Sequence, residues 1–91
     1  MKYVILAVSG GFYFFGCEIS APDGYIALKD ASMFGGFGGG KGLPGVARGD
    51  KSATVILDRF DAAAHLTFPL TAVYAIMPSI NLYEFAGATL R

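Results

Sequence analysis

Glycine is concentrated in one short part of this 91-residue chain, and this limits its fold more than any other feature. Eight of the 13 glycines lie within positions 35–49. Ordering glycine costs more backbone entropy than ordering any other residue, so a folded protein uses it where the chain turns tightly or approaches another group closely. Two phenylalanines and one lysine lie within this stretch or directly before it, at positions 34, 37 and 41. The stretch therefore predicts a loop that combines exposed backbone amides, a cation and aromatic faces.

Such a combination suits an anionic ligand that contains a ring. Backbone amides and a lysine would hold phosphates, and a nearby arginine would make a bidentate contact with a phosphate. A phenylalanine would stack on a base. The run is not a Walker A motif, because Lys41 is followed by Gly42, and no βαβ unit surrounds it. A loop without a ligand and packing of the rings against a neighbouring subunit remain alternatives. The candidate ligand-binding residues are Phe34, Gly36, Phe37, Gly38, Gly39, Gly40, Lys41 and Arg48.

The composition predicts a single domain over residues 1–91 that associates with copies of itself. The chain is 54% apolar and only 15% charged, whereas a chain of this size buries only about 60–65% of its unfolded surface. A homo-oligomer would bury the excess apolar surface. The net charge is zero and no basic stripe exists, which argues against binding to duplex nucleic acid. Positions 41–59 carry a local surplus of two positive charges, which favours a small anion over a polymer.

The residues that usually perform catalysis or bind metals are scarce. Cys17 is the single cysteine and His65 the single histidine, so neither a disulfide nor a conventional zinc site is expected. No nucleophile, base and orienting group stand in a recognisable arrangement, and we expect neither a cofactor nor enzymatic activity. An enzyme that cleaves a cyclic nucleotide remains an alternative, and it would require His65 to lie beside the glycine-rich loop.

The N-terminal segment raises the question of a secretory signal. Its positive region is a single lysine, Ser9-Gly10-Gly11 interrupts the apolar run, and Phe14 is a poor residue three positions before the cysteine. No apolar run reaches the roughly 18 residues that span a bilayer. We therefore expect a cytoplasmic protein without a membrane segment.

Strand signals dominate the first 30 residues. Residues 3–8 and 12–19 are rich in β-branched and aromatic side chains, and Ser9-Gly10-Gly11 between them predicts a tight hairpin. Ala21-Pro22-Asp23-Gly24 predicts a turn, after which residues 25–29 return as a third strand. These segments predict an antiparallel meander of three strands.

After the glycine-rich loop, residues 43–48 predict one helical turn that ends at Gly49. Strands are expected at 52–57, 65–68 and 71–77, and a final helix is expected to start at Pro78-Ser79 and stop at Gly87. The predicted fold class is α+β: a small, mostly antiparallel sheet of about five to six strands, with a short helical turn after the loop and a C-terminal helix.

Four segments resemble, in order, a small family of uncharacterised β-rich proteins encoded mainly by bacteriophages. The family has a YVIV hairpin, a GKEVVLKNAR strand, a GA-SL-LA segment and an LTEVIEIIP tail. The chain departs from the family at Ser32-Met33-Phe34, where the family tends to carry arginines and tryptophans. The matching stretches here are 2–17, 24–35, 41–52 and 66–87.

The resemblance implies a phage or prophage origin, and small phage proteins often act against host defence. The leading hypothesis is a non-enzymatic protein of the infected host's cytoplasm that sequesters a nucleotide-derived immune signal. The alternatives are an inhibitor that binds a host defence protein, such as a CRISPR effector, and a small structural protein that mediates assembly. The inhibitor hypothesis predicts an exposed apolar or aromatic patch and no small-molecule pocket.

Overall fold

A computed structural model describes residues 2–61 and 64–91, and it confirms the predicted three-stranded meander. The strands are β1 (Tyr3–Val8), β2 (Phe12–Ile19) and β3 (Tyr25–Gly38). Gly10 and Gly11 have φ values of 90° and 82°, as the tight hairpin between β1 and β2 requires. The third strand is much longer than the predicted 25–29, because it continues through half of the glycine-rich run.

The second half of the chain alternates short helical turns with strands. Gly49 adopts the left-handed conformation that ends the predicted helical turn. The elements are α1 (Gly42–Arg48), β4 (Thr54–Arg59), β5 (Leu66–Pro69), the 3₁₀ turn η1 (Leu70–Ala72), β6 (Val73–Ser79), the 3₁₀ turn η2 (Leu82–Glu84) and β7 (Ala88–Leu90).

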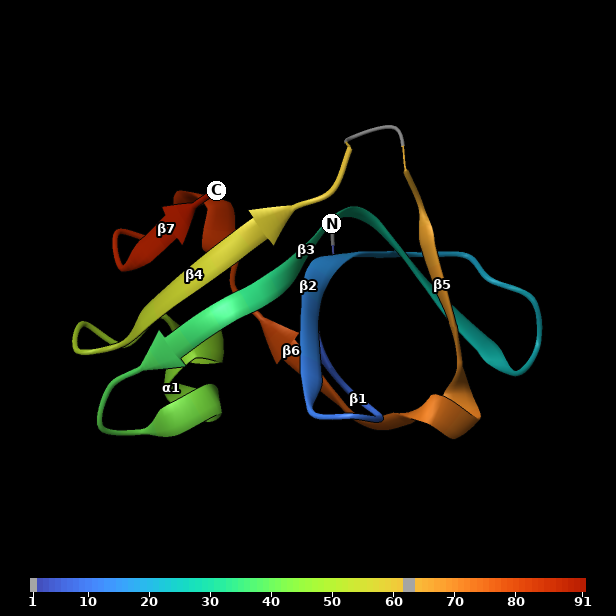
Figure 1. Cartoon of the computed structure of the whole chain (residues 1–91), viewed down its shortest axis with the longest axis horizontal. Coiled ribbons are helices and arrows are strands. Elements are labelled where there is room, and N and C mark those ends of the chain that lie inside the picture. The colour runs from blue at the N-terminus through green and yellow to red at the C-terminus, as the bar shows by residue number, and fades with distance from the viewer. Residues whose placement is uncertain (1, 62–63) are drawn as a thin grey trace.

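All seven strands join one mixed sheet in the order β6-β1-β2-β3-β4-β7, and β5 pairs separately with β3. Every pairing is antiparallel except that of β4 with β7. Figure 1 shows β4, β7 and α1 at one end of the longest axis, β5 at the other, and β1 and β2 between them. The mostly antiparallel sheet agrees with the predicted class, although it has more strands than expected.

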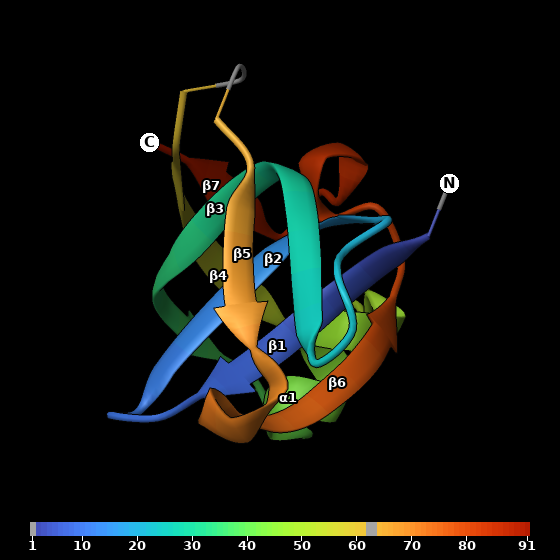
Figure 2. The ribbon, with the colours of Figure 1, turned by 90° about the vertical axis from the view of Figure 1, so that its right-hand side faces the viewer.

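Strand β3 pairs with three neighbours because it carries two irregularities. Its first half pairs with β5 and its second half with β4, while β2 lies along its other edge. The pairing of β3 with β2 shifts register opposite Gly16, between Lys29 and Ser32 of β3. Asp30 lies in this irregularity and has a φ of 49°. The other irregularity lies between Phe34 and Gly36. Extra residues of this kind bend a strand and increase its twist, so β3 curves from one neighbour to the next (Figure 2).

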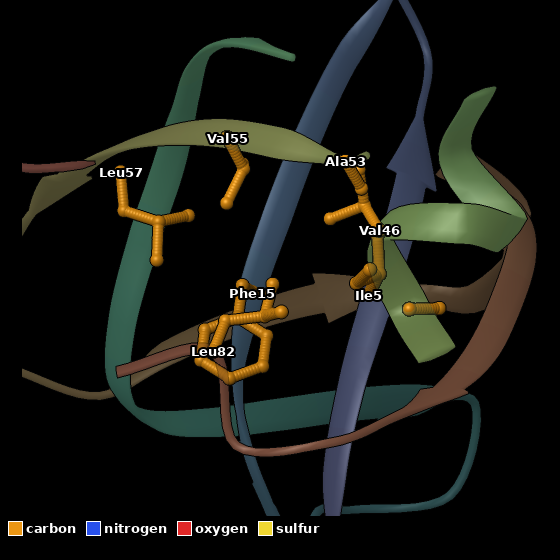
Figure 3. Packing of buried hydrophobic residues seen from close by; sticks show 8 residues of the cluster. Ile5, Phe15, Val46, Ala53, Val55, Leu57 and Leu82 are labelled. Carbon is orange, nitrogen blue, oxygen red and sulfur yellow. The ribbon is translucent and has the colours of Figure 1, made fainter. Parts of the chain in front are cut away.

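Side chains on the two faces of β1 and β2 enter two separate hydrophobic cores. The α1-side core lies between the sheet, α1 and η2, as Figure 3 shows, and the β5-side core lies on the opposite face. The alternation of side chains along β1 sends Ile5 to the first core and Val4 and Leu6 to the second. The α1-side core contains Ile5, Phe15, Val46, Ala47, Ala53, Val55, Leu57 and Leu82, and the β5-side core contains Val4, Leu6, Ile26, Leu28 and Ala31.

The predicted C-terminal helix is wrong. Strand β6 continues through Pro78 to Ser79, and the expected helical segment holds only η2 before β7 begins. Pro78 is tolerated because β6 is an edge strand, where the missing backbone N–H removes no ladder hydrogen bond on the outer side. The Ser79 hydroxyl bonds to the Ile80 carbonyl instead of capping a helix, and Asn81 accepts a hydrogen bond from the Tyr83 backbone N–H.

Candidate functional site

The predicted glycine-rich loop is a strand for half of its length, which corrects the sequence interpretation. Residues 34–38 pair with β4, with Phe34 opposite Leu57 and Phe37 opposite Val55. Residues 34 and 37 of a regular strand would point to opposite faces. The extra residue Gly35 changes the alternation, so both rings reach the same face and their centroids lie 5.9 Å apart.

Tyr13 of β2 completes an aromatic cluster with these two phenylalanines. Its ring centroid lies 5.9 Å from that of Phe34 and 5.6 Å from that of Phe37. The Phe37 contact is T-shaped, a preferred geometry for aromatic pairs. Phe34 packs against the α1-side core, whereas Phe37 is 39% exposed. The aromatic cluster therefore presents one partly exposed ring on a support fixed by two others.

An ion pair occupies the space beside Gly35. A Cβ atom at this position would lie 2.9 Å from a carboxylate oxygen of Asp58 and even closer to the Arg91 guanidinium. The Arg91 guanidinium makes a bidentate pair with the Asp58 carboxylate, with Nε–Oδ1 at 2.8 Å and Nη2–Oδ2 at 3.0 Å. These hydrogen bonds raise the pKa of Arg91 above its usual value. A side chain at position 35 would therefore have to displace this ion pair.

The rest of the run forms the turn into α1. Gly39 has a φ of 117°, and a Cβ there would lie 2.7 Å from the Ser52 carbonyl oxygen, so the turn requires glycine. Gly40 and Lys41 follow it and are exposed, and no ion pair of Lys41 is found in residues 2–61 and 64–91. Lys41 therefore offers a free positive charge four residues after Phe37.

The two predicted phosphate-binding cations are not brought together. Lys41 precedes α1 and Arg48 is its last residue, so the helix separates them by roughly 10 Å at a rise of about 1.5 Å per residue. Arg48 already binds Asp50, with Nη2–Oδ2 at 2.9 Å and Nε–Oδ1 at 3.4 Å. The structure thus brings Phe34 and Phe37 together, places Lys41 in the turn between β3 and α1, and places Arg48 at the far end of the helix.

A polar network around Tyr83 was not found from the sequence. The Tyr83 hydroxyl donates to the Asp30 carbonyl, so its oxygen accepts from the fully buried Ser32 hydroxyl at 2.8 Å. The Arg59 guanidinium lies 4.4 Å above the Tyr83 ring. Burial raises the pKa of Tyr83 above its ordinary value, against the opposing effects of the Ser32 hydrogen bond and the Arg59 charge. The network fastens η2 to the first irregularity of β3, which is a structural role.

The remaining titratable residues form no reactive arrangement. His65 is exposed in the segment before β5, and Cys17 is buried in β2. Across the described residues, no group of three or more histidine, cysteine, aspartate or glutamate side chains is placed to bind a metal ion. The same part of the chain contains no cleft or cavity for a small molecule, and none of its helices has the length and apolar character needed to cross a bilayer.

Comparison of the chain with protein-family models, with curated proteins and with solved structures finds no match. The resemblance to phage-encoded proteins therefore stays a prediction based on the four segments named above.

Proposed function

We propose that this protein is a non-enzymatic binder that engages a partner protein through the aromatic cluster of Tyr13, Phe34 and Phe37. The partly exposed Phe37 ring, held by two neighbouring rings, is the observation that supports this proposal. Aromatic side chains are enriched among the residues that dominate binding energy at protein interfaces, and a ring already fixed in place loses little entropy on binding.

The chemistry around the cluster suits a mixed apolar and acidic surface on the partner. Lys41 lies in the adjacent turn with a free charge, so an acidic group beside the apolar contact would complement it. The resemblance to phage-encoded proteins suggests a host defence protein as the partner, in the cytoplasm of the infected cell. Inhibition by direct binding requires neither a cofactor nor a catalytic group.

The test compares two phenylalanines of equal exposure. Phe37 and Phe60 are both 39% exposed, but Phe60 stacks near Phe14, away from the aromatic cluster. In affinity capture from host lysate, Phe37→Ala is expected to lose a partner that the unchanged protein and Phe60→Ala both retain. Truncation of a central interface aromatic commonly costs about 2 kcal/mol or more, or roughly 30-fold in affinity. Equal capture by both variants would contradict the proposal.

Sequestration of a nucleotide-derived signal is the second candidate, and the proximity of Phe37 to Lys41 in the chain favours it. The ring would stack on a base and the ammonium group would pair with a phosphate. A thermal-shift panel of cyclic dinucleotides, cyclic ADP-ribose isomers and ordinary nucleotides tests this function. A ligand at one hundred times its Kd adds about 2.7 kcal/mol to the stability, and Lys41→Ala should reduce that shift. Absence of a shift across the panel leaves the protein-binding function as the proposal.

A further inference from the structure

Strand β6 lies at the end of the sheet with one side unoccupied. It pairs with β1, and no other strand of the described chain pairs with it. Its outer edge therefore presents backbone N–H and C=O groups that can pair with another strand. The other terminal strand, β7, has three residues, whereas β6 has seven. Of the two ends of the sheet, β6 offers the longer free edge.

Strand β6 carries features that prevent such pairing only near its two ends. Proteins usually protect an exposed edge with charges, prolines or bulges. The sequence of β6 is VYAIMPS and contains no charge. A register shift lies at its start, opposite Ala7 and Val8, and Pro78 lies near its end. Tyr74 is the extra residue of this bulge, since Ala75 pairs with Ala7 and Val73 with Val8. The regular segment that is free to pair therefore runs from Ala75 to Met77.

Exposed apolar residues gather around this edge. Four of the nine large hydrophobic residues with substantial exposure lie in the eleven positions 70–80. Tyr74 is 76% exposed and Ile76 is 45% exposed within the strand itself. Leu70 in η1 and Ile80 after the strand are 44% and 42% exposed. The free edge is therefore bordered by side chains that would gain stability from burial.

We propose that β6 pairs antiparallel with β6 of a second copy of this chain, about a twofold axis at Ala75. A symmetric antiparallel pair places one residue opposite itself, and the small Ala75 suits that position. Ile76 of each copy then lies next to Tyr74, the bulge residue, of the other copy, and the symmetry repeats this contact of an aromatic and a β-branched side chain. The uncharged strand places no like charges opposite each other, and the neutral chain adds no long-range repulsion.

A stable interface buries about 800 Å² per partner, which requires more than backbone pairing. Leu70 and Ile80 lie before and after the strand, and Ile80 also contacts the end of α1 through Ala47 and Gly49. The exposed parts of both side chains would extend the contact at its two ends. The dimer would join the two sheets into one continuous sheet through their β6 strands. It leaves Phe37 outside the contact, because Phe37 lies on β3 and two strands separate β3 from β6. This inference is therefore independent of the proposed function.

The first test measures molar mass by light scattering during size-exclusion chromatography. Two chains of 9.5 kDa give 19.0 kDa for the unchanged protein. Ile76→Lys places two lysines near the axis and should weaken the dimer at least about 100-fold, giving 9.5 kDa. Leu90→Lys is the matched control, because Leu90 is 44% exposed on β7 at the opposite end of the sheet. It should remain a dimer.

A second measurement does not depend on how a variant folds. Amide hydrogen exchange of the unchanged protein at two concentrations should show more protection of β6 at the higher concentration and no change in β7. A mass of 9.5 kDa at every concentration would overturn the proposal. Dissociation by Leu90→Lys but not by a folded Ile76→Lys would also overturn it, since it would assign the contact to the β7 edge.

Discussion

The two hydrophobic cores use the same two strands but are closed in different ways. Elements that cross over the sheet, α1 and η2, cover the α1-side core, and its eight core residues are at most 5% exposed. The β5-side core has five such residues, and its cover is β5, a four-residue strand whose side chains are alternately half-buried and exposed. The first core is enclosed by separate elements, and the second by the sheet bending onto itself.

The two cores are therefore expected to contribute unequally to the free energy of unfolding. A buried side chain contributes in proportion to the apolar area removed from water, and it contributes more where neighbours surround it on every side. The α1-side core meets both conditions and also borders the polar network of Tyr83, Ser32 and Asp30. We therefore expect substitutions on the α1 side to cost more than equivalent ones on the β5 side.

Phe15 and Phe14 provide the largest test, because they are neighbours in β2 with opposite orientations. Phe15 is fully buried against Tyr3 and Tyr83, whereas Phe14 is partly buried against Phe68. Phe15→Ala should lower the free energy of unfolding by about 3–5 kcal/mol. Phe14→Ala should lower it by about 1–2 kcal/mol. Urea denaturation measures both values.

Equal losses for the two alanine variants would show that the cores contribute equally. If Phe15→Ala does not fold, Phe15→Leu and Phe14→Leu allow the same comparison with a smaller change in volume.

Removing one hydroxyl tests the polar network at the edge of the α1-side core. Tyr83→Phe leaves the buried Ser32 hydroxyl and the Asp30 carbonyl without this partner, so the free energy of unfolding should fall by about 1–3 kcal/mol. Tyr74→Phe is the control, because Tyr74 is 76% exposed and should change the stability by less than about 0.5 kcal/mol.

The same tyrosine predicts a pH dependence. Burial raises the pKa of Tyr83 in the folded state above its ordinary value of 10.0. The neutral Tyr83 hydroxyl therefore contributes its full stabilisation of the folded state below pH 10.0. This stabilisation is lost as the pH rises toward the folded-state pKa, because Tyr83 releases its proton first in the unfolded state. The unchanged protein should therefore lose more stability above pH 10.0 than Tyr83→Phe does. Parallel stability curves of the two proteins would contradict this expectation.

The smallest effect concerns the bend that lets β3 serve both cores. Asp30 has a φ of 49°, which aspartate tolerates and a β-branched residue does not. Asp30→Val should cost about 1–2 kcal/mol, and Asp30→Gly should remain within about 0.5 kcal/mol of the unchanged protein. Thermal denaturation compares them. Similar losses for both variants would mean that the backbone conformation is not the source of the cost.

Local signals sufficed to predict the meander and the helical turn of α1. The Ser9-Gly10-Gly11 turn, the β-branched residues around it and Gly49 act through neighbouring residues, so their structural effects were readable from the sequence. Pro78-Ser79 misled for the opposite reason. These two residues are extended and belong to β6, because β6 pairs with β1 and Ser79 lies opposite Tyr3. Neighbouring residues carry no information about such a distant partner.

The glycine-rich run shows the same limit for the candidate site. Its composition indicated tight backbone geometry, and Gly39 requires it. The surroundings of Gly35, however, are the Asp58 and Arg91 side chains that meet beside it, and both residues are far away in the sequence. The clustering of Phe34 and Phe37 was likewise hidden, because it depends on an extra residue that only the pairing with β4 reveals. The function predicted for these residues stays a prediction.

The placement of β3 has a consequence for cooperativity. Strand β1 supplies residues to both cores, and β2 supplies Phe15 to the α1-side core and packs Phe14 against the β5-side core. Strand β3 supplies Leu28 to the β5-side core and packs Phe34 against the α1-side core. Neither core can open fully without loosening strands that support its neighbour, so the chain is expected to unfold in a single transition despite its two cores. Tyrosine fluorescence and far-ultraviolet circular dichroism should then give the same midpoint. Two midpoints would reveal that the β5 side opens first as an independent unit.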